Sequence, residues 1–296
     1  MDLVSVIMPT YKNDGKSLKK AILSVLCQTY DNLELIVIND NYDMRYTDIV
    51  RGVISNFNSD KIVYHENIEN LGSAKSRNVG IAMAKGKYIT FLDDDDFYMP
   101  EKIEKQYQKM VDTEADYSIS NVELYSENGE LKDRRSRKYL ENGTLNTEEL
   151  INYHLKYHMT GTDTLMFKKD YLNKIGDFPL IDLGDEFYLM FNSIKGGGKL
   201  VYCNYYGVHA VIHEGEVGLS SGRNKIKCEE DLYEFKKRYF KDLDKETVKF
   251  IKTRHYAVLA FAELRCENIS GMIKHMFTAF SISPKSCFHI LKDRKG

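Results

Sequence analysis

Four consecutive aspartates directly follow a short apolar stretch, and this junction constrains the fold more than any other feature of the chain. Residues 87–96 read KYITFLDDDD. The residues before the acids are rich in β-formers and too few for a typical helix, so we expect a buried strand. The carboxylates then lie at the carboxyl end of that strand, which is where open α/β sheets bind their ligands.

The acids themselves indicate a cation. In an extended chain Asp93 and Asp95 project to the same side and Asp94 to the other. Two carboxylates on one side repel each other unless a cation lies between them, and a hard divalent cation that also holds a diphosphate would serve. The alternative is a solvated acidic turn, which is costly for four adjacent acids directly after a core strand.

Composition is that of an ordinary soluble globular protein. The residues are 43% hydrophobic and 29% charged. A length of 296 residues is enough for one large domain or for a domain with an appendage. No apolar run approaches the roughly 18 residues that would span a bilayer. The N-terminus lacks a basic n-region and a cleavage site, so we expect a first strand there and no signal peptide. Five cysteines without a C-x-x-C pair indicate free thiols in a reducing cytosol. We therefore expect a cytoplasmic protein, and no nucleic-acid partner.

The net charge of −2 conceals two regions of opposite sign. Residues 223–296 contain 17 Lys and Arg against 10 Asp and Glu, whereas residues 1–222 contain 25 against 34. Such asymmetry predicts two functional regions, residues 1–222 and a helical region at 223–296. An apolar stripe at 272–280 is more typical of core packing than of a membrane surface. The basic tail still favours peripheral contact with the anionic inner face of the plasma membrane.

Predicted strands and helices alternate along the first part of the chain. Strands are expected at residues 3–8, 33–38, 61–65 and 87–92. Helices are expected at 16–28, after residue 41 up to about residue 57, and at 74–85. This alternation predicts an α/β fold with a parallel, doubly wound sheet. Further strands are expected at 116–125, 162–168, 199–203 and 208–214, and helices at about 100–112, 147–156, 185–195 and from 224 onward. Residues 126–146 are polar and are expected to form an exposed excursion.

Four ordered motifs carry a resemblance to a known family. They are a strand ending in PTY at 9–11, ELIVIND at 34–40, NLG followed after four residues by RN at 70–78, and FLDDDD at 91–96. Over residues 3–222 the chain resembles the family 2 inverting glycosyltransferases of GT-A fold, of the type that builds bacterial surface polysaccharides. The resemblance implies a nucleotide-sugar donor, most simply a UDP-sugar. It also implies a divalent metal, Mn²⁺ or Mg²⁺, and a catalytic carboxylate separate from the metal site.

The resemblance also implies which residues bind the donor and the metal. Tyr11 would stack on the base and Asp40 would accept the imide N–H of uracil, although Asn39 stands where the family often has a second acid. His213 resembles a late histidine that touches the diphosphate or the metal, and residues 218–222 would form a lid. The implied nucleotide-sugar ligands are Pro9, Thr10, Tyr11, Asp40, Arg77, Asp93 and Asp94, and the implied metal ligands are Asp95, Asp93 and His213. Structural roles remain open for Tyr11, as strand-end packing, and for Arg77, as a solvated helical residue.

Asp185 and Glu186 open a predicted helix after Gly184 and match the acidic pair that supplies the family's general base. The order here is Asp-Glu where the family usually has Glu-Asp. Asp185 fits the position of the base best, with Glu186 as the fallback. The alternative is an N-cap, because a carboxylate at a helix N-terminus is favoured by about 0.3–1 kcal/mol in any case.

The motifs favour a metal-dependent inverting transferase acting on a hydroxyl of a glycan or lipid-linked acceptor. Two other classes remain open. A nucleotidyltransferase acting on sugar phosphates would also use acids on an α/β sheet, but it would release pyrophosphate rather than a nucleoside diphosphate. A non-catalytic carbohydrate-binding protein would turn over no donor.

Overall fold

The computed structural model describes residues 1–141, 145–181, 184–213 and 222–293. The chain divides into two compact units. The first comprises Met1–Thr147 and Thr160–Ile212, and the second comprises Glu148–Met159 and His213–Gly296. The functional boundary expected between residues 222 and 223 stays a prediction.

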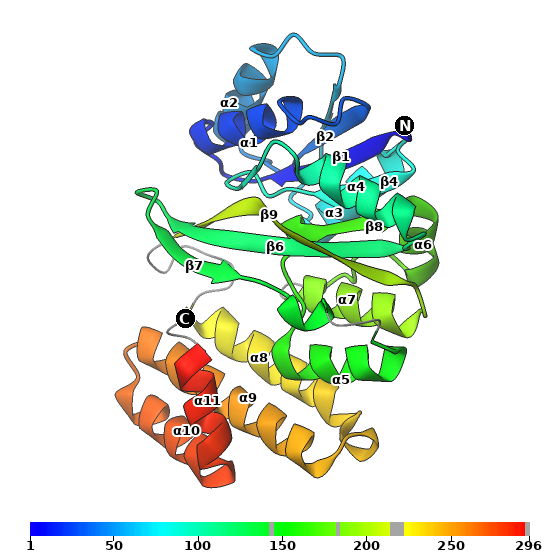
Figure 1. Cartoon of the computed structure of the whole chain (residues 1–296). Coiled ribbons are helices and arrows are strands. Elements are labelled where there is room, and N and C mark those ends of the chain that lie inside the picture. The colour runs from blue at the N-terminus through cyan, green and yellow to red at the C-terminus, as the bar shows by residue number, and fades with distance from the viewer. Residues whose placement is uncertain (142–144, 182–183, 214–221, 294–296) are drawn as a thin grey trace. The chain divides into compact units, whose positions relative to one another are not determined.

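The first unit is built on one mixed sheet (Figure 1). Among the described residues the strand order is β3-β2-β1-β4-β8-β6-β9-β5, with β7 paired to β6. The strands are β1 (Val4–Thr10), β2 (Leu33–Asn39), β3 (Ile62–Glu66), β4 (Tyr88–Phe91), β5 (Phe97–Tyr98), β6 (Tyr117–Ser126), β7 (Leu131–Arg135), β8 (Leu165–Lys168) and β9 (Leu200–Ile212). Strands β1 to β4 pair in parallel, as the alternating pattern predicts. Strand β8 runs antiparallel to both β4 and β6, which makes the sheet mixed.

The described helices of the first unit lie at the expected positions, with one exception. They are α1 (Lys16–Leu26), α2 (Met44–Ser55), α3 (Ser73–Met83), α4 (Lys102–Asp112), α6 (Lys169–Ile175) and α7 (Asp185–Lys195), with short 3-10 helices η1 (Lys138–Leu140) and η2 (Thr162–Thr164). Helix α6 was not expected. Three expectations about strands and loops differ. The strand expected at 162–168 begins only at Leu165, because residues 162–164 form η2. The excursion at 126–146 contains strand β7, and the two late strands are one strand, β9, whose register against β6 shifts near Asn121.

Side-chain alternation in β1 explains how the two faces of the sheet are covered. Val4, Val6 and Met8 lie in one buried cluster with the apolar residues of α1, α2 and α4. Ile7 points to the opposite face, against α3. A Cβ atom on Gly80 of α3 would lie 2.4 Å from Ile7, so only glycine permits this close approach. This packing fixes α3, and with it Arg77, against the strand.

The second unit is helical, as expected for the chain from residue 224. Its helices are α5 (Thr147–Tyr157), α8 (Gly222–Lys237), α9 (Lys245–Arg265), α10 (Ile269–Ile282) and α11 (Pro284–Asp293), with η3 (Phe240–Asp242). A small core joins α9, α10 and α11 through Phe250, Ala257, Ala279, Cys287 and Ile290. None of the helices in the described residues is long and apolar enough to cross a membrane.

Candidate active site

The carboxyl end of β1 meets the acidic turn. Pro9 and Thr10 close the strand, and the Thr10 hydroxyl donates a hydrogen bond of 2.5 Å to the Asp94 carboxylate. Tyr11 comes next and is 42% exposed, with the Lys12 ammonium 5.1 Å from the centroid of its ring. The stacking role of Tyr11 stays a prediction.

Asp40 follows the neighbouring strand β2 and is buried. One oxygen accepts hydrogen bonds from Asn67 Nδ2 and the Leu71 amide, and the other from Asn70 Nδ2 and the Gly72 amide, at 2.7–3.0 Å. A carboxylate has about four acceptor sites, so all of them are used here. Asp40 therefore holds the 67–72 segment, and an imide N–H would have to displace one of these donors.

Arg77 is the buried cation of the site. Its guanidinium donates to Asp93 at 2.6 Å and to Asp185 at 3.2 Å, and it lies 5.3 Å from the centroid of Phe178. Burial disfavours the charged form, but the two carboxylates outweigh burial and raise the pKa of Arg77. The Nε atom is buried without a hydrogen-bond partner. Arg77 is thus not the solvated helical residue that was the alternative.

The four aspartates form a turn between β4 and β5, not an extended segment. The Asp96 amide donates to the Asp93 carbonyl at 3.2 Å, an i to i+3 bond that folds the chain back. The expectation that Asp93 and Asp95 share one side assumed an extended chain, and the turn contradicts that assumption. The turn instead brings Asp93 and Asp96 together, and Asp95 lies between them in sequence at the turn. The role of Asp95 as a metal ligand stays a prediction.

Asp163 completes this cluster. Oxygen atoms of Asp93, Asp96 and Asp163 all lie within 4.8 Å of one another. Asp163 comes from η2, is 5% exposed, and accepts the Asp93 amide at 3.2 Å. Burial, together with repulsion from Asp93 and Asp96, raises the pKa of Asp163 well above its usual range. Asp163 was not predicted from the sequence, because a lone acid 70 positions from Asp93 carries no local signal.

The electrostatics of the turn fit a divalent cation. Burial raises the pKa of Asp94 and of Asp96 to about 7, and repulsion from neighbouring acids adds to the effect. Clustered carboxylate oxygens are the hard ligands that Mg²⁺ and Mn²⁺ prefer. A bound cation would offset both the burial of these carboxylates and their mutual repulsion, so the residues present fit a metal ion.

Asp185 and Glu186 begin α7, after Gly184 at φ 82°. Asp185 pairs with Arg77, and burial raises the pKa of its carboxyl group. Glu186 is engaged elsewhere, because one of its oxygens accepts from the Gly161 amide, the Thr162 amide and the Thr162 hydroxyl at 2.9–3.3 Å. The structure brings Asp185, but not Glu186, into contact with the guanidinium that also binds the acidic turn.

A second buried cation, Lys102 of α4, was not foreseen. It is fully buried, donates to Thr90 of β4 at 2.5 Å and lies 4.0 Å from the centroid of Tyr98. Burial lowers the pKa of its ammonium group to about 7. Lys102 supports the strand that carries the acids. Its sequence context, KIEKQ, is typical of an exposed helix and gave no signal.

His213 directly follows β9, is exposed and belongs to the second unit, so its role as a metal ligand stays a prediction. Residues 218–221 of the predicted lid lie outside the described residues.

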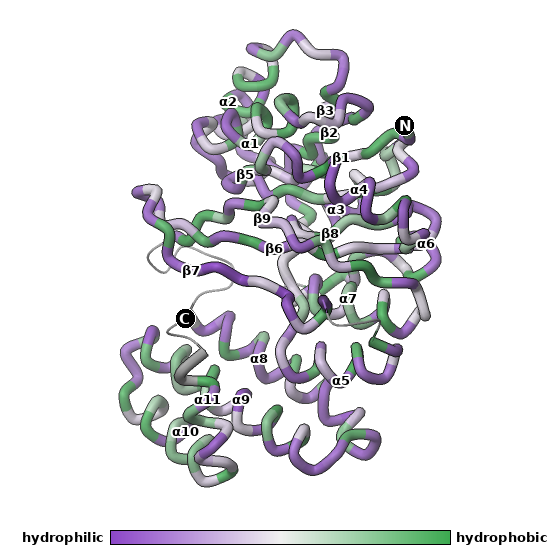
Figure 2. Tube along the Cα trace, viewed as in Figure 1, coloured by the Kyte–Doolittle hydropathy of each residue, from purple (hydrophilic) through white to green (hydrophobic). Residues whose placement is uncertain are grey.

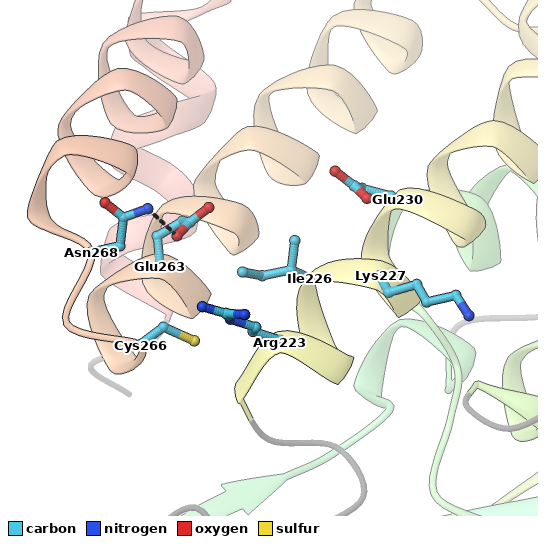
Figure 3. Close-up of a pocket in the computed structure, with 7 residues that line it drawn as sticks. All are labelled: Arg223, Ile226, Lys227, Glu230, Glu263, Cys266 and Asn268. Carbon is cyan, nitrogen blue, oxygen red and sulfur yellow. Dashed lines mark hydrogen bonds between the residues drawn. The ribbon is translucent and has the colours of Figure 1, made fainter.

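The second unit also has a pocket of about 480 Å³ between α8 and the end of α9 (Figure 3). The pocket is lined by basic and acidic side chains, a thiol, an amide and one apolar side chain. They are Arg223, Ile226, Lys227, Glu230, Glu263, Cys266 and Asn268. Nothing in this lining points to one class of ligand.

Comparison with known proteins decides the family. A model described as "Glycosyl transferase family 2" matches residues 5–176, more than half of the chain. The chain belongs to glycosyl transferase family 2. The match spans β1, the acidic turn and Asp163, and it ends before Asp185. The expectation that this protein is a glycosyltransferase is confirmed.

Several curated relatives are similar over different shares of this family 2 chain. An uncharacterized glycosyltransferase, MJ1057 of Methanocaldococcus jannaschii, is 33% identical over 58% of this chain and 58% of its own length. WfaP of Escherichia coli, a UDP-Glc:alpha-D-GlcNAc-diphosphoundecaprenol beta-1,3-glucosyltransferase, is 27% identical over 94% of this chain and 97% of its own length. WfgD, with the same activity in its name and from the same species, is 30% identical over 65% of this chain and 70% of its own length.

Among solved structures, Staphylococcus aureus TarS 1-349 in complex with UDP-GlcNAc has a TM-score of 0.60 at 16% identity. The match covers 95% of this chain and 92% of that one. At this identity the likeness shows the fold alone, and it confirms the GT-A architecture expected for a family 2 glycosyltransferase.

Proposed function

We propose that this family 2 glycosyltransferase transfers a sugar, with inversion, from a UDP-sugar to a hydroxyl of a lipid-linked glycan acceptor. Two relatives named as acting on a diphosphoundecaprenol acceptor with UDP-Glc support this proposal, one of them over nearly the whole chain. The product class is a bacterial surface polysaccharide or its lipid-linked precursor. The proposed location is the cytoplasm, against the inner face of the plasma membrane where such an acceptor would be embedded.

The observation that carries the proposal is the link from Asp93 through Arg77 to Asp185. Inverting transfer needs a carboxylate at the acceptor, distinct from the acids beside the donor diphosphate. Asp185 is our candidate for this carboxylate, because the guanidinium holds it next to the acidic turn and it is not part of the carboxylate cluster. Its raised pKa also suits a group that takes up a proton.

In this proposal the donor lies along the carboxyl ends of β1, β2 and β4. Tyr11 stacks on the base, and the segment held by Asp40 borders it. Asp93, Asp96 and Asp163 are proposed to hold a divalent ion, Mn²⁺ or Mg²⁺, with Asp95 and His213 as further predicted ligands. When bound, such an ion stabilises the negative charge of the departing diphosphate.

Asp185 is proposed to accept the proton of the acceptor hydroxyl at the carboxylate oxygen that Arg77 does not bind. The acceptor oxygen then attacks the anomeric carbon from the face opposite the diphosphate, through an oxocarbenium-like transition state. Arg77 orients the Asp185 carboxylate by binding its other oxygen. One bond forms, to the acceptor oxygen, and one breaks, to the diphosphate, so the products are the glycoside and UDP.

The test is incubation of the purified protein with UDP-Glc or UDP-GlcNAc, Mn²⁺ and a diphospholipid-linked GlcNAc acceptor. We expect release of UDP in equal amount to a new glycoside whose anomeric configuration, read by NMR, is opposite to that of the donor. Pyrophosphate as the product would indicate a nucleotidyltransferase. Retention of the donor's anomeric configuration would contradict the single-displacement mechanism. Absence of turnover with every UDP-sugar would favour a non-catalytic carbohydrate-binding protein.

A further inference from the structure

Helix α10 has two apolar faces, and only one of them is packed. Met276 and Ala279 pack against the small core of the second unit. On the other face, Ile269, Ile273, Phe277 and Phe280 recur at helical spacing and are all exposed, Phe277 to 72% and Ile273 to 59%. The sequence pattern at 272–280 was expected to be core packing, and this is correct for only part of it.

Helix α11 extends the exposed face. Phe288 is 64% exposed, and its ring centroid lies 6.0 Å from that of Phe280. We call Ile269, Ile273, Phe277, Phe280 and Phe288 the α10–α11 patch. Figure 2 shows hydrophobic residues along much of α10, and a mixture of hydrophobic and hydrophilic residues on α11. Soluble proteins rarely expose clustered large apolar side chains unless the cluster contacts a partner or a membrane.

The charges near the patch indicate what kind of surface it contacts. Residues 268–292 contain no Asp or Glu but include Lys274, Lys285 and Lys292. Lys274 and Lys285 are exposed, and Lys274 comes directly after Ile273. Long side chains beside an apolar stripe can keep their ammonium groups at the level of lipid phosphates while the stripe enters the acyl region. A segment with lysines and no acid between residues 268 and 292 makes the exposed apolar side chains complementary to an anionic bilayer.

We propose that the α10–α11 patch is a membrane-docking surface that binds the anionic leaflet. The apolar side chains insert at the headgroup boundary, and the flanking lysines contact lipid phosphates. The proposal deepens the proposed function and rests on it in one respect: an acceptor on a diphospho-isoprenoid lipid would be embedded in the same leaflet. The apolar patch, rather than the basic tail alone, is then the principal contact.

The experiment is vesicle flotation of the full chain with phosphatidylglycerol–phosphatidylcholine vesicles and with phosphatidylcholine vesicles. The test variant is Ile273→Ser with Phe277→Ser. The matched control is Leu23→Ser with Val111→Ser, which removes two exposed apolar residues from helices of the first unit. We expect wild type and control to float with anionic vesicles at low salt. The test variant should bind these vesicles at least about tenfold more weakly than wild type. Lys274→Glu with Lys285→Glu should lose binding to anionic vesicles only.

Several results would overturn the proposal. Wild type that ignores anionic vesicles at low salt, where charge attraction is strongest, has no such surface. Equal binding of the test variant and wild type would place the contact elsewhere. A concentration-dependent dimer in sedimentation velocity that Ile273→Ser with Phe277→Ser dissociates, without any vesicle binding, would assign the patch to a second copy of the chain.

Activity measurements separate this proposal from the proposed function. With a short, water-soluble acceptor analogue, the test variant should transfer sugar at the wild-type rate. With a long-chain acceptor in vesicles, its rate should fall with its vesicle binding. If wild type transfers sugar to neither acceptor but still floats with anionic vesicles, the transferase proposal fails while the docking surface stands.

Discussion

The Nη1 atom of Arg77 lies 3.2 Å from a carboxylate oxygen of Asp185, the first residue of α7. The same guanidinium binds Asp93 of the acidic turn through its other terminal nitrogen. One buried cation therefore connects the two carboxylate groups to which the proposed mechanism gives different tasks. Chain segments 108 residues apart meet at this side chain.

Replacing Arg77 should cost stability as well as activity. Arg77→Met leaves two carboxylates without their buried partner, and breaking such a pair typically costs about 3–5 kcal/mol. We expect the lower end of that range, because the Asp93 side chain is 40% exposed. The control is Arg51→Met, which breaks a surface pair with Glu66 and should cost about 1 kcal/mol or less. Denaturant unfolding compares the two, and equal losses would contradict the role given to Arg77.

UDP binding should require a divalent cation. We expect calorimetry to detect UDP binding with Mn²⁺ and to lose it in EDTA. Asp96→Asn should weaken the metal-dependent affinity at least tenfold, since it removes one of three clustered carboxylates. Asp95→Ala tests the ligand predicted from sequence in the same way, and Asp48→Asn, on an exposed helix position, is the control. Unchanged UDP affinity in EDTA would rule out a metal-dependent donor site.

The metal-free protein should lose stability as pH rises through the acid range. Burial raises the pKa of Asp96 to about 7 in the folded protein, against about 3.9 in the unfolded chain. Between these values the unfolded chain releases its proton first, so the folded state is favoured at low pH and loses that advantage toward pH 7. Asp96→Asn lacks this titration. Between pH 5 and pH 7, wild type should lose stability relative to Asp96→Asn by on the order of 1–3 kcal/mol.

Mn²⁺ should reverse that trend, because the ion binds the ionised carboxylates and displaces their protons. Its stabilising effect on the wild-type melting temperature should be larger at pH 7 than at pH 5. The comparison is best kept at or below pH 7, since the lowered pKa of Lys102 makes stability rise with pH above that value. A metal effect that is independent of pH would argue against binding at the protonated cluster.

Local patterns in the sequence predicted the parts of the site that follow strands. Thr10, Asp40 and Asp93 each lie at or just beyond the carboxyl end of a parallel strand, where the alternation of elements places them. The pairing of Asp93 with Asp96 depends on a turn that an apolar-then-acidic pattern does not specify. Asp163 joins the carboxylate cluster because β8, which directly follows η2, pairs antiparallel with β4. This pairing depends on the whole sheet and cannot be read from one segment of the sequence.

The same distinction explains the two acids of α7. Their shared position at a helix start made Asp185 and Glu186 close competitors. Tertiary contacts separate them, because Glu186 holds the Gly161–Thr162 backbone while Asp185 meets Arg77. A helix N-terminus favours either carboxylate, so neither contact could be read from the helix alone.

The most direct test of this account compares Asp185→Asn with Glu186→Gln for both donor binding and transfer. The amide in Asp185→Asn keeps the size and one acceptor oxygen of the carboxylate but cannot take up the proton. We predict that its UDP–Mn²⁺ affinity by calorimetry stays within a few-fold of wild type, whereas sugar transfer falls by about a hundred- to ten-thousand-fold. Glu186→Gln should be much milder in transfer, because one oxygen still accepts the Gly161 and Thr162 donors. Near-normal transfer by Asp185→Asn, with Glu186→Gln inactive, would contradict the assignment and move the base to Glu186.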